Sequence, residues 1–433
     1  METISTRIHR ELGLPAGPLD FALIERAVEA KLGEFEDLDW KGVLPEKGEV
    51  NIEEFAKDVA AMANTRGGLL VFGVKETRGT GKAESIKPVD ISETAQGRFR
   101  SLVGSRIHPF IAGLRILALP SPNSDDGEGV LVVVVPRSAD APHAFGNDKL
   151  GIPYRFESKT NWMRERELEA AYAERFHRRT ADQARLIEIL DGVTGRVDLT
   201  TGAWLVAASA PRVAYPGTLP RITLAQARQI LTDALSRTNA IASPQISERQ
   251  TLIRDLDNAG LNPRKGLRRW VAHTAQSLGP DSLSDFVYVE VHDDGSVGFA
   301  AKTEGWFKPV YDDRYQVPIG LAESFVIDAV ALTVTTARNL GLDGQSGIAV
   351  DLRRNDQSRP VAMLDAERRG GFTLHEFGQP SWSRSVLKFE TVLGEVQHDG
   401  DDDALRRAAA TISRDVLNQF GFDYSLVLKD VEV

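Results

Sequence analysis

The chain contains no cysteine among its 433 residues. This absence excludes disulfide bonds, thiolate zinc sites and cysteine nucleophiles. No segment approaches the roughly 18 consecutive apolar residues that a membrane helix needs. The N-terminus lacks a basic region followed by an apolar run, so we expect no signal peptide. Together these absences favour a cytoplasmic protein with no membrane contact.

Several familiar site signatures are also missing. The eight histidines give no pair at metal-ligand spacing, and no serine lies in a Gly-x-Ser-x-Gly elbow, so a hydrolase triad is not supported. The segment Gly79-Thr80-Gly81-Lys82 fails as a nucleotide-binding P-loop, because Ala83 follows where Ser or Thr is required. The net charge of −10 argues against a protein that coats nucleic acid through bulk charge, although a local basic groove remains compatible with it.

The length and the patterning predict a mixed α/β (α+β) protein of two domains, because 433 residues exceed one ordinary core. We place the domains at residues 1–180 and 181–433. In the first, apolar spacing and turn residues predict a helix over 19–28, a strand over 39–43, a helix capped by Asn51 with Glu54 in a capping box, strands over 69–74 and 130–135, a turn at 125–127 and a long helix over 164–190.

The sequence of the second domain shows fewer clear patterns of secondary structure. Its patterns indicate a strand over 204–210, a hairpin of 286–292 with 297–301, helices over 323–340 and 404–420, and a final strand over 424–428. We expect this domain to have a sensing, regulatory or oligomerisation role.

Four charged residues near the N-terminus form the first candidate site: Glu34, Asp39, Lys41 and Glu76. Their local spacing alone favours a solvated acidic edge in which Lys41 is an ion-pair partner. If the strand of Asp39 pairs with the strand that ends at Val74, Glu76 instead comes to lie beside Asp39. Carboxylates gathered in this way beside a lysine can hold a divalent metal against a phosphodiester.

Cations and aromatic rings alternate in a second stretch that contains Tyr154, Arg155, Phe156, Lys159, Trp162, Arg164 and Arg166. This mixture suits a nucleic acid, with cations on phosphates and rings available for stacking. It equally suits an edge strand and a first helical turn whose rings lie in the core. Arg66 is a further candidate phosphate contact, beside a helix end at Gly67-Gly68. A cluster of Arg264, Lys265, Arg268 and Arg269 is interpreted as a solvated helix face.

The order of these motifs resembles the Schlafen AlbA_2 domain, over roughly residues 30–175. The resemblance is carried by Glu-x4-acid-aromatic-Lys, then a helix ending Ala-Asn-Thr-x-Gly-Gly, then an apolar strand ending Gly-Val-x-acid, followed by a Pro-bounded strand and a Tyr-Arg strand. In Schlafen ribonucleases this module is associated with metal-dependent cleavage of transfer and ribosomal RNA.

The resemblance implies which residues act. The catalytic acids and metal ligands fall on Glu34, Asp39 and Glu76, with Mg²⁺ or Mn²⁺ as cofactor and Lys41 beside them. Asp39 stands where the family usually has Glu, and Glu76 where it usually has Asp. Arg66, Lys75, Arg155, Lys159 and Arg164 would hold the nucleic-acid backbone.

The chain also departs from the animal family members, because their zinc site uses cysteines and their nuclease core has two similar lobes. Only one lobe is visible here, so we expect a homodimer or the second domain to supply the other. The leading hypothesis is a metal-dependent endoribonuclease for structured RNA such as tRNA, which in a bacterium would fit antiviral defence. The alternative is a non-catalytic DNA-binding regulator whose second domain senses a ligand or pairs subunits.

Overall fold

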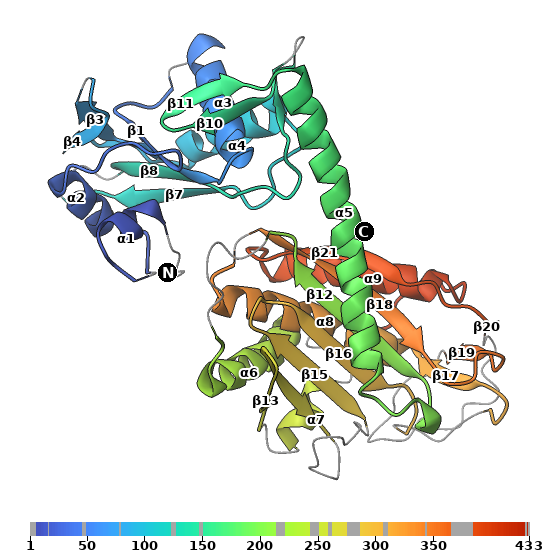
Figure 1. Cartoon of the computed structure of the whole chain (residues 1–433). Coiled ribbons are helices and arrows are strands. Elements are labelled where there is room, and N and C mark those ends of the chain that lie inside the picture. The colour runs from blue at the N-terminus through green and yellow to red at the C-terminus, as the bar shows by residue number, and fades with distance from the viewer. Residues whose placement is uncertain are drawn as a thin grey trace. The chain divides into compact units, whose positions relative to one another are not determined.

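The computed structural model of the chain describes residues 6–15, 17–45, 49–77, 79–122, 127–146, 150–213, 221–242, 251–258, 262–274, 286–305, 311–342, 344–364, 384–428 and 431. The chain divides into two compact units, Met1–Thr180 and Ala181–Val433, called here the N-terminal and C-terminal units (Figure 1). Both units mix helices with strands, so the predicted mixed α/β class is confirmed.

The N-terminal unit is built on a five-stranded sheet. Strand β1 (Leu38–Lys41) runs parallel to β2 (Gly68–Phe72), and β2 pairs antiparallel with β8 (Glu128–Val135). The other elements that begin in this unit are α1 (Arg7–Glu11), α2 (Phe21–Glu29), α3 (Glu49–Ala63), β3 (Val74–Thr77), β4 (Lys82–Ile86), β5 (Val89–Asp90), α4 (Glu93–Arg106), β6 (Ile107–His108), β7 (Arg115–Pro120), β9 (Ala144–Phe145), β10 (Pro153–Phe156), β11 (Lys159–Trp162) and α5 (Glu165–Thr194).

This sheet is covered on both faces, as the uninterrupted apolar sequence of β2 predicts. Leu69 and Val71 point to the layer of α1 and α2, while Leu70 and Phe72 point to the layer of α3 and α4. In the second layer the ring centroids of Phe55 and Phe99 lie 4.7 Å apart in an edge-on arrangement, and Phe72 joins them. Truncating one of these rings to alanine is expected to cost about 3–5 kcal/mol.

Two sequence predictions in this unit are wrong. The apolar run does not form one strand to Val74, because it breaks at Gly73, whose φ of +97° is favoured only by glycine. Helix α3 begins at Glu49, so Asn51 lies inside the helix and is not its cap. The predicted turn at 125–127 involves Asp125 and Asp126, which lie outside the described residues.

The C-terminal unit contains a seven-stranded sheet in the order β13-β14-β15-β16-β12-β18-β21, with every neighbouring pair antiparallel. A smaller sheet joins β17, β19 and β20. The elements of this unit are a 3-10 helix (Leu199–Thr201), β12 (Trp204–Pro211), α6 (Leu224–Ile241), α7 (Ile253–Asn258), β13 (Arg264–Gly266), β14 (Arg269–His273), β15 (Val287–His292), β16 (Val297–Lys302), β17 (Tyr315–Pro318), α8 (Ile319–Asn339), β18 (Gln345–Arg353), β19 (Val361–Leu364), β20 (Arg384–Val386), β21 (Val392–Gln397) and α9 (Asp402–Asn418).

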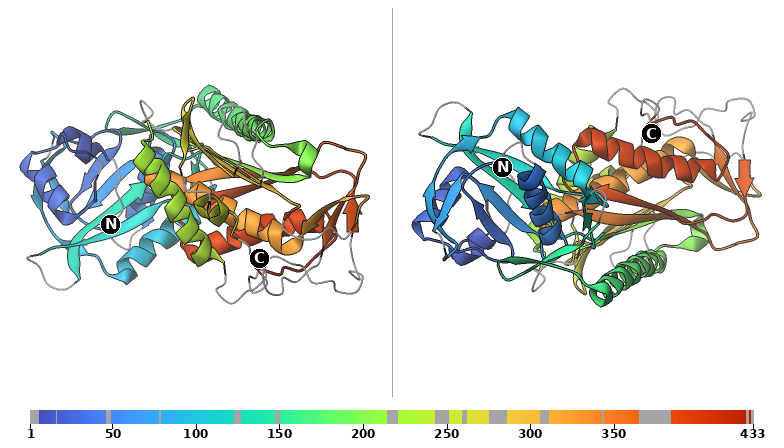
Figure 2. Two further views of the ribbon diagram at one scale, coloured as in Figure 1. Left: turned by 90° about the horizontal axis from the view of Figure 1, so that it is seen from below. Right: turned by 90° about the horizontal axis from the view of Figure 1, so that it is seen from above.

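The two faces of the large sheet carry different helices (Figure 2). Helices α6, α8 and α9 pack on one face, while Leu186, Leu190 and Val193 of α5 pack on the other. Among the described residues α8 is the one helix long and apolar enough to cross a membrane, but its apolar window is fully buried inside the unit. It is therefore the core helix of this unit.

Two acids of α8 are completely buried and accept hydrogen bonds from neutral groups. Asp328 accepts from the Thr238 hydroxyl and from the backbone N–H groups of Leu252 and Ile253. Glu323 accepts from the Ser425 hydroxyl and from the successive N–H groups of residues 426, 427 and 428. These carboxylates fasten α6, α7 and the segment 425–428 to the core helix.

The predicted hairpin of the second half is confirmed as β15–β16. Two other predictions there are wrong. Residues 424–428 form no strand, because Glu323 takes the backbone N–H groups that a strand partner would need. Residues 264–269 form the β13–β14 hairpin and not a helix.

Candidate functional site

Asp39 is the buried centre of the candidate site. Its side chain lies on β1, and the residue is 3% exposed. The Lys41 ammonium lies 2.9 Å from Asp39 Oδ1, and the Arg155 guanidinium contacts Oδ2. Burial opposes ionisation of Asp39, but the charges of Lys41 and Arg155 outweigh it, so the pKa of Asp39 is lowered. Asp39 is therefore a carboxylate held between two cations.

Glu34 lies directly against Asp39. Its Oε1 accepts the backbone N–H of Trp40 at 3.2 Å, and its own N–H donates to the Gly81 carbonyl at 2.8 Å. Burial, then the charge of Asp39 and a hydrogen bond with it, and then the charge of Glu76 raise the pKa of Glu34 to about 8. At neutral pH Glu34 consequently holds a proton that it shares with Asp39.

The strand pairing that would bring Glu76 toward this pair is present. Strand β1 pairs with β2 with Asp39 opposite Leu70, and the N–H of Gly73 donates to the Lys41 carbonyl at 2.8 Å. Strand β3 therefore starts beside the end of β1. Glu76 is exposed on β3 and acts on Glu34 through its charge, without a direct contact to Asp39.

Asp58 is a member of the cluster that sequence reasoning missed. It projects from α3, is 7% exposed, and lies 3.6 Å from the Lys41 ammonium. The Thr160 hydroxyl of β11 donates to its Oδ1 at 3.1 Å. Burial and the charge of Asp39 raise the pKa of Asp58. In the sequence, Asp58 directly precedes Val59, which is buried on α3. An acid at a buried position is rare unless it is paired, so this position could have indicated a partnered carboxylate.

The Asn64-Thr65 dipeptide positions the β10–β11 hairpin. The Asn64 side-chain amide donates to the carbonyls of His143 and Pro153, and Thr65 Oγ1 accepts the backbone N–H of Arg155 at 2.9 Å. These bonds fix β10 so that Arg155 reaches Asp39. Close packing explains the glycines that follow, since a Cβ on Gly67 would lie 2.5 Å from the Val135 carbonyl oxygen.

The interpretation of Arg155 as a phosphate contact needs correction. Its side chain is 5% exposed and its guanidinium is committed to Asp39 and to the Ser158 carbonyl, so it does not face a ligand backbone. Two rings of the same hairpin do not lie in the core, because Phe156 is 60% and Trp162 is 48% exposed. The hairpin thus turns its arginine inward and two aromatic rings outward.

The other predicted phosphate contacts lie at the surface. Arg66 is 73% exposed and 3.3 Å from Glu36, and Lys75 is 2.8 Å from Glu84. Lys159 and Arg164 are exposed at the end of the hairpin and the start of α5. These four cations are exposed to solvent, and Arg66 and Lys75 each pair with an acidic side chain.

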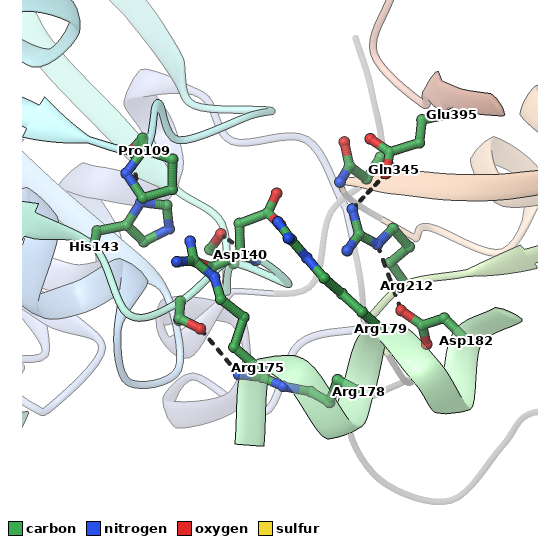
Figure 3. Close-up of polar contacts among 12 residues, drawn as sticks. Pro109, Asp140, His143, Arg175, Arg178, Arg179, Asp182, Arg212, Gln345 and Glu395 are labelled. Atoms are coloured by element: carbon green, nitrogen blue, oxygen red, sulfur yellow. Dashed lines mark hydrogen bonds and ion pairs between the residues drawn. The ribbon is translucent and has the colours of Figure 1, made fainter. Parts of the chain in front are cut away.

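Three arginines of α5 in this unit have a structural role (Figure 3). Arg175 donates to the Asp140 carbonyl, Arg178 to the Ala141 carbonyl at 3.2 Å, and Arg179 pairs with the Asp140 carboxylate at 3.3 Å. They fix the loop that carries His143, whose Nδ1 contacts the Pro109 carbonyl. In the C-terminal unit, Arg212 similarly links Asp182 to Glu395.

Two of the three predicted metal ligands, Glu34 and Asp39, lie against each other. The raised pKa of Glu34 leaves a proton on this pair that a bound cation would displace, while both oxygens of Asp39 already face Lys41 and Arg155. Within the described residues no three acidic or histidine side chains are placed to hold one metal together. Mg²⁺ in proteins commonly uses one or two carboxylates, with waters and substrate phosphate completing its shell, so Glu34 and Asp39 are the residues that would hold it.

Residues 34–164 match the family model described as Schlafen, AlbA_2. The match begins at Glu34 and ends at Arg164, immediately before α5, so it spans the whole acid cluster and the β10–β11 hairpin. No curated protein matches the chain.

One solved structure with a match is the crystal structure of the DIP2311 protein from Corynebacterium diphtheriae. It is 18% identical over 33% of this chain and 26% of that chain, with a TM-score of 0.21. The matched part therefore spans about a quarter of that protein, and this likeness carries no argument about function.

Proposed function

Because residues 34–164 form a Schlafen AlbA_2 domain, which indicates a role in binding or cleaving nucleic acid, we propose that this protein is a metal-dependent endoribonuclease for structured RNA such as tRNA. The observation that supports the proposal is the convergence of Glu34, Asp39 and Lys41 in one cluster. A carboxylate pair that retains a proton beside a partly exposed ammonium has the chemistry of a phosphodiester-cleaving site.

Glu34 and Asp39 would hold Mg²⁺ or Mn²⁺, with Glu76 as the third acid of the family pattern. When bound, the cation would polarise the phosphodiester and lower the pKa of an attacking water. The Lys41 ammonium is 39% exposed, so it can contact a phosphate oxygen while it stays paired with Asp39. Arg155 orients Asp39, and Asp58 holds Lys41 on its other side.

The test is incubation of the full chain with tRNA and Mn²⁺, beside a chelator control and the Asp39→Asn variant. Asp37→Asn is a matched control, because Asp37 lies two residues away and pairs with Arg7 at 2.8 Å and Arg10 at 2.6 Å outside the cluster. We expect cleavage by the unmodified protein and by Asp37→Asn only. Equal cleavage by Asp39→Asn, or no cleavage with any divalent metal, would overturn the proposal.

One observation favours a second candidate function, a DNA-binding regulator that does not cleave. Both oxygens of Asp39 already face cations, so the buried carboxylate is neutralised without a metal. This candidate predicts salt-dependent duplex binding that persists in Glu34→Ala and Asp39→Asn without nicking of the DNA. Gel-shift titration of these variants distinguishes the two functions.

The proposal extends to the cellular role. Cleavage of tRNA stops translation, so in a bacterium this activity would serve antiviral defence in the cytoplasm, with the C-terminal unit sensing or restraining it. A homodimer would supply the second lobe of the nuclease clamp. Light scattering of the purified full chain, with and without tRNA, tests the subunit count.

A further inference from the structure

Strand β13 lies at one edge of the seven-stranded sheet (Figure 1), and the β13–β14 hairpin has a strongly basic sequence. Residues 264–269 include four cations and no acid, in a chain whose net charge is −10. Lys265 and Arg268 are exposed, and Leu267 at the turn is 86% exposed. The Lys265 ammonium lies 5.9 Å from the Trp270 ring centroid, and the Trp270 indole N–H donates to the Ile222 carbonyl, which ties the hairpin to the unit.

Beside the hairpin, one buried acid contacts Arg269 of the hairpin and two further basic side chains. Glu290 on β15 is 2% exposed, and it contacts His292 at 3.0 Å, Arg269 at 3.5 Å and Arg196 at 3.9 Å. The Tyr288 hydroxyl also donates to Glu290 at 2.9 Å. Glycine at position 298 leaves room for this carboxylate, because a Cβ there would lie 2.8 Å from Glu290 Cγ.

The basic side chains around Glu290 remain partly exposed. Arg196 is 35%, Arg269 22% and His292 21% exposed, so their outer atoms remain open to solvent while Glu290 is enclosed. We call Arg196, Arg264, Lys265, Arg268, Arg269 and His292 the cationic edge. The buried carboxylate neutralises one charge and holds the basic groups in place, which lowers the ordering cost of binding an anion.

We propose that the cationic edge binds the phosphate backbone of a nucleic acid, so that the C-terminal unit is itself a nucleic-acid-binding module. A row of fixed arginines and a lysine along a β-hairpin complements a repeating row of phosphates. The one apolar residue at the turn, Leu267, is too little for membrane insertion, which needs a broad apolar face. This proposal does not rest on cleavage by the N-terminal unit.

The test measures binding of the full chain to a fluorescent RNA hairpin by anisotropy, in chelator so that the RNA stays intact. We expect Lys265→Ala/Arg268→Ala to weaken binding at least about tenfold near 0.1 M salt and to reduce the slope of log K against log salt by about 2. The control is Lys388→Ala/Arg407→Ala, which removes two exposed cations elsewhere in the same unit. A DNA hairpin of the same sequence shows whether the ribose contributes.

Unchanged affinity and salt slope in the hairpin variant overturn the proposal. It is also overturned if the variant keeps RNA binding but loses binding to phosphatidylserine vesicles, which would assign the edge to a membrane. A third contrary result is unchanged RNA binding with new oligomers on size exclusion, which would mean that the cations only block edge-to-edge strand pairing. A loss of RNA binding equal to that of the control variant likewise rejects it.

Discussion

Asp39 in the N-terminal unit and Glu290 in the C-terminal unit are equally buried carboxylates with opposite surroundings. Asp39 shares its cluster with two further acids, Glu34 and Asp58, so acids outnumber Lys41 and Arg155. Glu290 stands alone among Arg196, Arg269 and His292, and its pKa is lowered: burial opposes ionisation, but the His292 hydrogen bond and these charges outweigh it. An excess of acid favours protons and metal cations, while an excess of cations favours phosphate. Local charge balance therefore separates a candidate reaction site from a candidate binding surface.

The largest expected effect is loss of the buried Asp39–Arg155 pair. Asp39→Ala should lower the free energy of unfolding of the N-terminal unit by about 3–5 kcal/mol, because Arg155 is left buried and unpaired. Glu290→Ala should cost less, since Arg269 and Arg196 can turn to solvent. Hydrogen exchange of residues 34–164 and of β15 in increasing urea measures both losses. The comparison between the two carboxylates fails if Glu290→Ala lowers the free energy of unfolding more than Asp39→Ala does. The double variant Asp39→Leu/Arg155→Met should regain most of the lost stability, because no buried charge is left unpaired, but it should not restore cleavage.

The raised pKa of Glu34 predicts a pH dependence opposite in sign to that of Glu290, whose pKa is lowered. In chelator, the folded state keeps a proton on Glu34 that the unfolded chain releases above its ordinary pKa of 4.5. Stability from this group therefore falls as the pH rises from about 4.5 and levels off above about 8. Subtracting the profile of Glu34→Gln isolates this contribution from the buried histidines. A difference profile that is flat over this window would show that the two acids do not share a proton.

A smaller effect is expected at Asp58, which contacts Lys41 from α3. Asp58→Asn keeps an acceptor for Thr160 but removes the charge beside the ammonium, so cleavage should slow about tenfold with RNA affinity unchanged. Thr160→Val is the control that keeps the charge, and it should slow cleavage less. Equal losses in both variants, or weakened RNA binding in Asp58→Asn alone, would contradict a positioning role for this carboxylate.

The smallest effects on stability are expected at the exposed cations of the N-terminal unit. Arg66→Ala and Lys159→Ala should each change the free energy of unfolding by less than about 0.5 kcal/mol. Each should nevertheless weaken RNA binding and reduce its salt slope by about 1 if it contacts a phosphate. Thermal unfolding and anisotropy titration at several salt concentrations measure the two quantities. Glu165→Ala, an exposed change of the opposite sign, serves as the control.

The sequence predicts well where local pattern decides the structure. The apolar runs of β2 and β8 and the alternation of β15 and β16 identified strands correctly. The expected pairing of β1 with β2 is present, but Glu76 acts on Glu34 through its charge and does not contact Asp39. The break at Gly73 and the hairpin at 264–269 were missed, because a positive φ and an edge-strand register are set by neighbours distant in sequence.

The inward turn of Arg155 was missed for a similar reason. Its partner Asp39 lies 116 residues earlier, and the hydrogen bonds that aim it come from Asn64 and Thr65. Asp58 was overlooked because its partners Lys41 and Thr160 lie on strands that are distant from it in sequence. Side chains that pair across distant elements are what composition and spacing do not specify.

The Glu323 carboxylate gives the segment 425–428 a distinctive kinetic behaviour. Three consecutive backbone N–H groups and one hydroxyl bond to this single side chain, so none can open independently of the others. In deuterated solvent these amides would exchange together, as one event whose rate is the rate at which the segment detaches from α8. That shared rate would therefore measure how often the core helix α8 loses its contact with the segment 425–428.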